Sequence, residues 1–432
     1  MRYSRILIAA ALLSTNSLMA CGGREAPTAE PGVTLLTVWA HSGQESERQA
    51  LTRMVEQFNA TNDDIRVDIT FLADGGYNSQ VQSAALANAL PDLLEFDGPF
   101  VYNYAWQGHL LPLDDLLPDE LRERLIPSII EQGTYAGGLY SVGMYDSGLG
   151  LYGRRSMLDE AGVRIPAGPE DAWSADEFEA ALAALAAITP HGRALDLKLN
   201  YTGEWYCYAF SPAIQSAGGD LIDREDYQSA DGVLNSPEAV AVMTRFQSWL
   251  NEHEYVDPNT DDTAFTGGRV ALSWVGHWEY PRYLEAHGDD LVVMPLPDFG
   301  NGPRTGQGSW NWGITRRCED PAAAMRFLEF LLEDAQVLAM TEGNAAVPAT
   351  TTAAAQSPLY AEGSPLNLFV TQLTEGYGVP RPATPAYGVI TSVFEQAFDD
   401  IRNGADVQTV LDRAVAAIDR DIADNEGYPE PQ

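Results

Sequence analysis

Strand-like and helix-like segments alternate regularly after residue 33, and this alternation most constrains what the chain can fold into. Residues 34–39 are apolar on both faces of an extended chain, which is typical of a strand covered by helices on both sides. Residues 45–59 repeat apolar side chains at the helical period, and residues 65–71 alternate as a second strand. A helix over 77–89 and a strand over 92–96 complete a β-α-β-α-β pattern. The pattern predicts an α/β fold with parallel strands and right-handed crossovers.

The same alternation continues to the end of the chain. Ser174, with Glu177 three residues later, predicts a capped helix that runs to Ala187. Because 432 residues exceed one typical core, two lobes are expected. The other expected strands span 139–144, 148–152, 270–275 and 291–294, and the other expected helices span 154–161, 237–251, 321–333, 391–402 and 407–421, with one more beginning at Asp334.

The first 21 residues predict export. Arg2 and Arg5 precede an apolar run from Ile6 to Leu13, a pattern typical of a secretory signal. The run is shorter than the roughly 20 apolar residues that span a membrane. The ending Leu-Met-Ala-Cys resembles a bacterial lipobox, so we expect a signal peptide over 1–20 and a tether over 21–32 that is lipidated at Cys21. The alternatives are an ordinary secretory signal and a transmembrane anchor.

Charge and cysteine usage exclude several classes of partner. The chain carries 25 basic and 62 acidic residues, a net charge of −37, so neither nucleic acid nor an anionic membrane surface is an expected partner. The lipid must therefore do the anchoring. Cys207 and Cys318 either pair in an oxidising compartment or remain buried thiols. No Cys-x-x-Cys or His-rich tract predicts a metal, and no cofactor is expected.

One short motif resembles a nucleotide-binding fingerprint but lies in the wrong context. Residues 148–153 read Gly-Leu-Gly-Leu-Tyr-Gly and match GxGxxG, yet they alternate like a strand and do not open a helix. No P-loop, HExxH or GxSxG motif is present. The 62 acidic residues offer many candidate pairs of carboxylates, and a glycosidase needs only one such pair. An exported carbohydrate-active enzyme is therefore an alternative.

Aromatic residues stand beside polar ones where strands are expected to end. Ligands of open α/β sheets bind outside the carboxyl ends of the strands. A sugar offers hydroxyls to carboxylates and C–H faces to indole rings, so this combination favours a carbohydrate. His41 is interpreted as a polar loop residue, and Trp310 is favoured over Trp312 as a ligand contact, since one of the two can fill the core. Candidates at such positions are Gln44, Glu45, Tyr77, Asp97, Tyr145, Asp146, Trp278, Trp310 and Trp312.

The order of these features resembles the extracellular solute-binding proteins of family 1, the sugar-binding lipoproteins of bacterial ABC importers. The resemblance covers nearly the whole chain after the leader and rests on several stretches in family order. They are TVWAHSGQESE, LTRMVEQFNATNDDIRV, ALPDLLEFDGPFVYNYAWQGHLLPLDDLL, YSVGMYDSGLGLYGRRSMLDEAGV, WSADEFEAALAAL, AFTGGRVALSWVGHW, GSWNWGIT, DPAAAMRFLEFLL and AAVPAT.

The resemblance implies a two-lobed periplasmic-binding-protein-like fold. Each lobe would be a mostly parallel sheet flanked by helices, with the ligand cleft between the lobes. The chain would cross near Tyr145–Gly148, near Ala264–Gly267 and after the Trp-rich segment. The expected N-terminal lobe is 33–144 plus 268–313, and the expected C-terminal lobe is 145–267 plus 314–432.

The resemblance also implies a function and ligand contacts. The chain would bind a mono- or oligosaccharide, without catalysis, and deliver it to an ABC permease as a lipid-anchored, extracytoplasmic monomer. The same fold with a polyamine or another small osmolyte as ligand is an alternative, because an acid-rich cleft suits cations. Contacts implied by the resemblance are Glu45, Asp97, Tyr145, Asp146, Glu204, Trp205, Trp278, Trp310 and Arg381.

Overall fold

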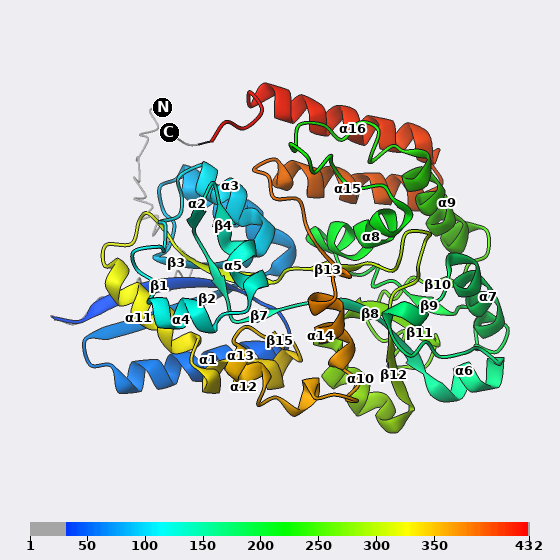
Figure 1. Cartoon of the computed structure of the whole chain (residues 1–432), viewed down its shortest axis with the longest axis horizontal. Coiled ribbons are helices and arrows are strands. Elements are labelled where there is room, and N and C mark those ends of the chain that lie inside the picture. Colours follow the sequence, from blue (N-terminus) through cyan, green and yellow to red (C-terminus); the bar gives the residue numbers. More distant parts are fainter. Residues whose placement is uncertain (1–31, 431–432) are drawn as a thin grey trace, which may run out of the picture.

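The computed structural model describes residues 32–430, so the expected signal peptide, Cys21 and the rest of the tether before residue 32 lie outside the described residues. Two groups of elements lie side by side, and each surrounds a five-stranded sheet (Figure 1). We call the half around β1 (Thr34–His41) the first lobe and the half around β8 (Leu149–Arg154) the second lobe. The expected two-lobed α/β architecture is confirmed. Within the described part of the chain, no helix combines the length and apolar character that crossing a membrane requires.

The first sheet grows from the β-α-β-α-β pattern at the start of the fold. β1 pairs in parallel with β2 over its whole length and with β3 on its other side. β14 then runs antiparallel to both β3 and β6. The strand order is β2 (Ile65–Leu72), β1, β3 (Leu93–Asp97), β14 (Trp310–Ile314), β6 (Val142–Gly143).

The second sheet has the same mixed character. β9 pairs in parallel with β10 and β11, whereas β8 runs antiparallel to β11 and β12. In each sheet four of the five strands run in one direction, and only β14 or β8 runs opposite to them. β8 and β14 each follow a segment that leads from the other lobe, so no βαβ crossover constrains their direction. The order is β10 (Val256–Asp257), β9 (Leu195–Asp196), β11 (Leu272–Gly276), β8, β12 (Leu291–Met294).

The observed sheets divide the chain differently from the expected lobe boundaries. β11 and β12, expected in the first lobe, pair with β8 in the second sheet. Ala264–Gly267 is not a crossing, because it lies between β10 and β11 of one sheet. α11 (Pro321–Leu331), expected in the second lobe, packs on the first, where Phe327 meets Phe58 edge-on at 5.1 Å.

Short strand pairs join the lobes. β7 (Tyr145–Asp146) pairs antiparallel with β15 (Val347–Pro348), and β13 (Thr305–Gln307) pairs in parallel with β16 (Gly378–Pro380). The chain thus crosses directly before β8, as expected near Tyr145–Gly148. At the far end of the chain, Trp106 Nε1 of the first lobe donates to the carbonyl of Pro429 at 2.9 Å.

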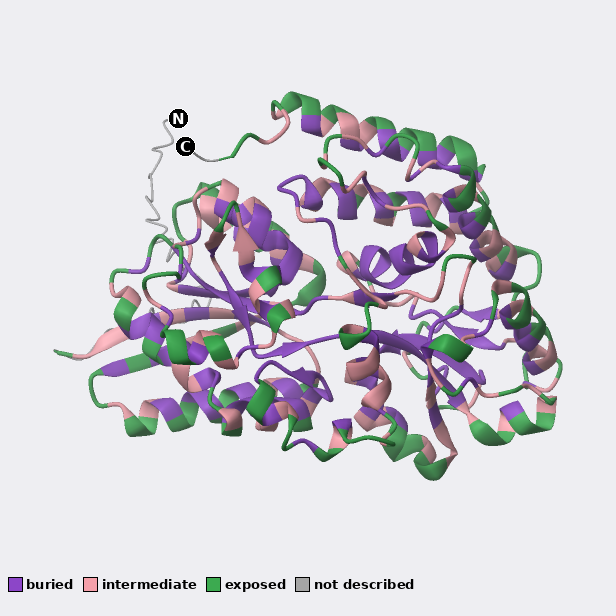
Figure 2. Ribbon diagram, in the orientation of Figure 1, coloured by how far each residue is buried: buried purple, intermediate pink, exposed green. Residues whose placement is uncertain are grey.

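Helices cover the sheets and bury their inner faces (Figure 2). The first lobe also contains the small β4 (Thr134–Tyr135) and β5 (Gly138–Leu139) hairpin. The remaining first-lobe helices are α1 (Glu45–Thr61), α2 (Tyr77–Leu86), α3 (Val101–Trp106), α4 (Asp119–Arg124), α5 (Pro127–Gly133), α12 (Asp334–Asn344) and α13 (Thr351–Ala354). Those on the second-lobe side are α6 (Arg155–Ala161), α7 (Ala175–Ala186), α8 (Glu204–Ala217), α9 (Pro237–Asn251), α10 (Tyr280–His287), α14 (Asn367–Thr374), α15 (Tyr387–Arg402) and α16 (Val407–Asp424).

A local signal explains where α7 begins, whereas α8 and α15 differ from expectation. Ser174 Oγ accepts the backbone N–H of Glu177 while Glu177 accepts the N–H of Ser174, so the expected capping box of α7 is confirmed. α15 begins at Tyr387, before the expected start, and α8 was not expected at all. α8 is buried over most of its length, so it lacks the amphipathic period by which helices are detected.

Large aromatic side chains fill the cores of both lobes. Phe58 and Phe327 lie in the first-lobe core, and Phe178 and Trp249 lie in the second. Fully burying a Phe side chain stabilises the fold by about 1.5–3 kcal/mol. The two remaining cysteines are separate: Cys207 lies in α8 and Cys318 precedes α11, and both are free, buried thiols.

Candidate functional site

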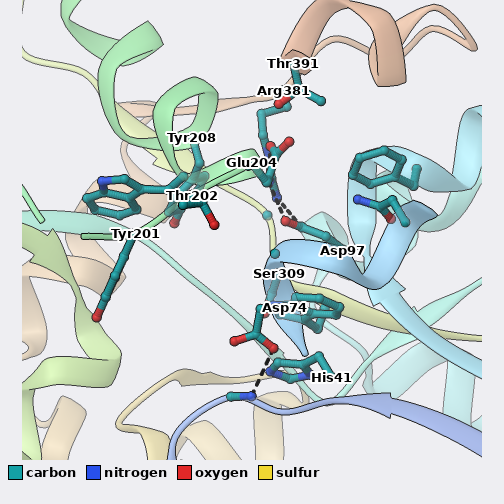
Figure 3. Close-up of a pocket in the computed structure, with 18 of the residues that line it drawn as sticks. His41, Asp74, Asp97, Tyr201, Thr202, Glu204, Tyr208, Ser309, Arg381 and Thr391 are labelled. Atoms are coloured by element: carbon teal, nitrogen blue, oxygen red, sulfur yellow. Dashed lines mark hydrogen bonds and ion pairs between the residues drawn. The ribbon is translucent and has the colours of Figure 1, made fainter. Parts of the chain in front are cut away.

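A cavity of about 950 Å³ lies between the lobes, within the usual range for small-molecule sites. Its walls come from the ends of β1, β3 and β11, from the starts of α2, α8 and β14, and from segment 381–395. Side chains that are far apart in the sequence meet there (Figure 3). The strand ends thus face a common cavity, as expected for α/β sheets.

An aromatic stack forms part of the first-lobe wall. The ring of His41, at the end of β1, lies flat on the indole of Trp310, with centroids 3.8 Å and planes 8° apart. Tyr77 meets the same indole edge-on at 5.3 Å and donates its hydroxyl to the carbonyl of Trp39 at 3.3 Å. The indole is therefore held from two sides at the edge of the cavity.

Two carboxylates keep the His41 ring charged. Nδ1 lies 2.7 Å from Glu95 Oε2, and Nε2 lies 3.5 Å from Glu47 Oε2. Burial lowers the pKa of His41, but the negative charges of Glu95 and Glu47 outweigh burial and raise that pKa well above its usual value. Trp310 consequently stacks on an imidazolium, which cation–π attraction favours.

Glu47 stays ionised although it is buried. Burial raises its pKa, but His41 together with hydrogen bonds from Tyr145 and Asn344 lowers the pKa of Glu47 to about 2. The Tyr145 hydroxyl donates to Oε1 at 2.7 Å, and Asn344 Nδ2 donates to the same oxygen at 3.0 Å. Because Tyr145 belongs to β7, this network joins the first-lobe wall to the crossing segment.

A guanidinium bridges the two lobes across the cavity. Arg381 donates to both carboxylate oxygens of Asp97, at 2.8 and 2.6 Å, and to Glu204 Oε1 at 2.6 Å. Figure 3 shows Arg381 beside Glu204 with its head directed at Asp97. Asp97 ends β3 of the first lobe, whereas Glu204 begins α8 of the second. The arginine side chain is 4% exposed, so this bridge is largely shielded from water.

Glu204 carries a strongly perturbed carboxyl group. Burial raises its pKa, and the nearby Asp97 adds to this effect, while Arg381 opposes it; the resulting pKa of Glu204 is about 7. The Tyr387 hydroxyl also donates to Oε1. The second oxygen, Oε2, is buried and has no hydrogen-bond partner among the described residues.

Aromatic rings dominate the second-lobe wall. Trp205 meets Trp278 edge-on at 6.0 Å and Tyr201 at 5.2 Å, and Tyr208 lies 6.2 Å from Trp278. The indole of Trp205 donates to the carbonyl of Leu197 at 3.1 Å, which fixes its orientation. The ring of Tyr208 also lies 4.8 Å from the Arg381 guanidinium. Aromatic rings thus line the cavity on both sides, with most of them on the second-lobe side, and carboxyl groups of both lobes lie among them.

A glycine allows Trp278 its position. A Cβ atom at Gly276 would lie 2.0 Å from Cζ3 of Trp278, far inside van der Waals contact. The indole folds back over the backbone at the end of β11. Only a residue without a side chain permits this close approach.

The structure brings most of the expected ligand contacts to the cavity. Four others lie elsewhere: Glu45, Tyr77, Asp146 and Trp312. The residues that line the cavity are Gln44, Asp97, Tyr145, Glu204, Trp205, Trp278, Trp310 and Arg381.

Glu45 and Tyr77 lie just outside the cavity wall. The Glu45 side chain is 68% exposed and pairs with Arg48, while Glu47, two residues along α1, is buried and lines the cavity. Side chains two positions apart on a helix point in directions that differ by roughly 200°. Because Glu47 faces the cavity, Glu45 points away from it. Tyr77 is almost fully buried behind Trp310 and supports that ring.

Asp146 and Trp312 do not line the cavity and instead stabilise the fold. Asp146 accepts the backbone N–H groups of Ser147 and Gly308, at 2.8 and 3.2 Å, and so joins two crossing segments. Trp312 lies in the first-lobe core, edge-on to Phe327 at 6.3 Å. Trp310 and Trp312 point to the same face of β14, as expected. Trp310 lies at the end of the strand, next to the cavity, and Trp312 lies deeper in the sheet.

Several lining residues are not apparent from the sequence. His41, interpreted as a polar loop residue, lines the cavity and stacks on Trp310. Four further lining residues are not among the expected contacts: Glu47, Tyr208, His277 and Asn344. Glu47 carries a usable signal, because an acid three residues after Gln44 is the partner position of a capping box. Asn344 and Tyr208 carry none, since they reach the cavity only through tertiary packing.

The GxGxxG motif does not line the cavity between the lobes. No group of three or more His, Cys, Asp or Glu residues within 32–430 is placed to hold a metal ion. The GxGxxG motif lies in and beside β8, where Gly150 and Gly153 pack against Met294 of the neighbouring strand. These glycines serve close strand packing, as the alternation of that segment indicated.

Two curated relatives are similar over most of the chain. The maltodextrin-binding protein MdxE of Bacillus subtilis (strain 168) is 23% identical over 435 residues, which cover 96% of each chain. A protein of Streptomyces antibioticus described as "Uncharacterized lipoprotein in oleD 5'region" is 24% identical over 359 residues, 81% of this chain and 77% of that one.

Solved structures share the fold. The GacH receptor of Streptomyces glaucescens, studied unliganded and with acarbose, superposes with a TM-score of 0.76 at 21% identity, covering 92% of this chain and 98% of that one. The maltotriose-bound domain MalE of Bdellovibrio bacteriovorus gives a TM-score of 0.75 at 20% identity. The superposition covers 90% of this chain and 100% of that one. The family model described as "Bacterial extracellular solute-binding protein" matches residues 53–365. With its two lobes and the cavity between them, the chain belongs to the bacterial extracellular solute-binding proteins.

Proposed function

We propose that this protein is the substrate-binding component of an ABC importer and captures a mono- or oligosaccharide between its lobes. The observation that carries the proposal is the combination of indole rings and carboxyl groups that line one cavity between the lobes. Indole rings suit the C–H faces of a sugar, and carboxylates accept its hydroxyls. The maltodextrin-binding relative and the acarbose and maltotriose complexes of similar structures support this ligand class.

Binding would proceed by closure of the two lobes over the sugar. The crossing segments at β7, β13 and β15 connect the lobes and are the places where a hinge motion would act. The closed form would then be recognised by the permease. In this proposal the protein acts as a monomer and performs no chemistry. A family and a relative that are described as binding proteins support the second point.

The location of the protein is part of the same proposal. Residues 1–20 serve as a signal peptide, and Cys21 becomes the lipidated N-terminus that holds the protein outside the cytoplasm. The extracellular family and the lipoprotein relative support this location. Replacing the lipidation site, Cys21→Ser, should move the protein from the membrane fraction to the soluble extracytoplasmic fraction; unchanged membrane association would contradict the anchor.

Calorimetry tests the ligand class directly. Folded, ligand-free protein is titrated with maltose, maltotriose, mannobiose and spermidine, and at least one sugar should give saturable heat. Trp278→Ala should weaken sugar binding at least about tenfold, because a stacking ring is lost. Glu45→Gln is the matched control and should bind normally, since Glu45 is directed to solvent.

Two outcomes would contradict the proposal. Heat with spermidine and none with any sugar would favour the polyamine alternative. Release of shorter sugars from maltotriose during incubation, detected by chromatography, would identify an enzyme.

A further inference from the structure

His277 is a buried imidazole at the end of β11, in the second lobe, and it lines the cavity. It is 2% exposed. Its Nδ1 lies 2.7 Å from the carbonyl oxygen of Asn344. A carbonyl only accepts hydrogen bonds, so Nδ1 carries the proton and donates it. Burial lowers the pKa of His277 to about 4, so near neutral pH the ring is uncharged and Nε2 is left as a bare acceptor.

This acceptor has no partner among the described residues. Nε2 of His277 is buried and makes no hydrogen bond there. The rings packed around the imidazole are Trp278 at 5.3 Å, Tyr145 at 6.2 Å and Phe369 at 6.4 Å, all edge-on. Native proteins rarely leave a buried acceptor unpaired, so an unpaired one in a ligand cavity points to the ligand.

Two donors beside His277 are already in use. The Tyr145 hydroxyl and the Asn344 amide both donate to Glu47 Oε1, at 2.7 and 3.0 Å. Glu47, ionised beside His41, is the charged group that acts on His277, and it offers no proton. The Tyr145 hydroxyl and the Asn344 amide are therefore committed to Glu47, and neither is available to Nε2 of His277.

We infer that Nε2 of His277 accepts a hydrogen bond from one hydroxyl of the bound sugar and selects for that hydroxyl. The inference rests on the proposed function and names a specificity residue within that site. Trp278, the next residue, would stack on the face of the same sugar ring. His277 and Trp278 together would thus recognise one face of a sugar ring and one hydroxyl of the same ring.

The first lobe holds this acceptor in place. Asn344 ends α12, which packs on the first lobe, and the His277–Asn344 bond joins it to the second lobe. The tautomer that leaves Nε2 unprotonated is therefore set by contact between the lobes. Recognition of the hydroxyl therefore depends on the arrangement of the lobes in which His277 and Asn344 are in contact.

Two substitutions separate the acceptor from the interlobe bond. His277→Asn keeps an amide N–H at the place of Nδ1 and removes the acceptor, whereas His277→Gln puts an amide oxygen at the place of Nε2. Binding of maltotriose, mannobiose and their monodeoxy derivatives is measured by calorimetry. H277N should bind the parent sugar about tenfold more weakly than wild type, and H277Q should stay within about threefold. One monodeoxy derivative should bind wild type about tenfold more weakly than the parent sugar, yet bind wild type and H277N equally.

The possible results of this experiment separate the role inferred for His277 from the proposed function. Equal binding of the parent sugar by wild type and H277N would overturn the inference and leave the proposed function standing. A loss in H277N that persists for every monodeoxy derivative would also overturn it, because the residue would then be structural. If H277N does not fold, H277Q carries the test: discrimination between the parent sugar and the derivative should survive in it. If wild type binds no sugar of the panel, the proposed function fails and this inference fails with it.

Discussion

At the scale of single residues, the site depends on a charge placed behind an aromatic ring. His41 is held between Glu95 and Glu47 and presents its flat face to Trp310 at 3.8 Å. The charged imidazole thereby fixes an indole that borders the cavity. Its two carboxylates keep it charged, although burial alone would discharge it.

The raised pKa of His41 makes a testable contribution to stability. The folded state retains this proton to a higher pH than the unfolded chain, whose histidine pKa is near 6.5. The contribution of His41 to the free energy of unfolding is therefore fully present below pH 6.5. It falls by about 1.4 kcal/mol per pH unit as the pH rises from there towards the folded pKa. Urea unfolding of wild type and His41→Gln between pH 5.5 and 9 should show the difference between them shrinking as the pH rises.

The control for this experiment is a histidine on the surface. His191 is exposed, so His191→Gln should stay parallel to wild type over the same range. A wild-type minus His41→Gln difference that is flat with pH would refute the charged ring.

At the scale of elements, the ends of strands deliver the ligand contacts. β1 ends at His41, β3 at Asp97 and β11 directly before His277 and Trp278. The turn after β11 is tight enough for the indole to cover the backbone of Gly276. The position of Trp278 is thus a property of the strand end as much as of the tryptophan.

Adding a methyl group at this turn should displace the ring. In Gly276→Ala the new Cβ would meet Trp278 Cζ3 at 2.0 Å, so the indole must move away. Sugar affinity measured by calorimetry should fall at least about tenfold. Gly168→Ala is the matched control, because a Cβ added there would meet no atom within 4 Å and the backbone is extended. Normal affinity in Gly276→Ala would mean that Trp278 does not contact the sugar.

At the scale of the whole molecule, the lobes are joined by charge as well as by chain. Arg381 holds Asp97 of the first lobe and Glu204 of the second in one buried bridge. The carboxylates are only 12% and 16% exposed. Removing the cation would leave both of them poorly solvated, with no partner of opposite charge.

Arg381→Met should therefore lower the free energy of unfolding by about 3–5 kcal/mol, as measured by urea denaturation. Arg122→Met breaks an ion pair with Asp114 in which both side chains are more than a third exposed, and should change stability by less than about 1 kcal/mol. Adding Asp97→Asn to Arg381→Met should recover part of the loss, because one uncompensated carboxylate is removed. Equal stability of Arg381→Met and wild type would show that the bridge does not hold the lobes.

Short-range patterns in the sequence are sufficient to predict the local elements and the class of the molecule. The period of residues 34–71, the Ser174 capping box and the aromatic strand ends are short-range signals, so they are readable without a structure. The sheet that β11 and β12 join becomes apparent only in the folded molecule, since strand pairing across more than a hundred residues leaves no local pattern. The tertiary structure also decided that Glu47 and not Glu45 faces the cavity, that Trp312 is core, and that His277 meets Asn344. These outcomes depend on which surfaces pack together when the lobes assemble, and that information is spread over the whole chain.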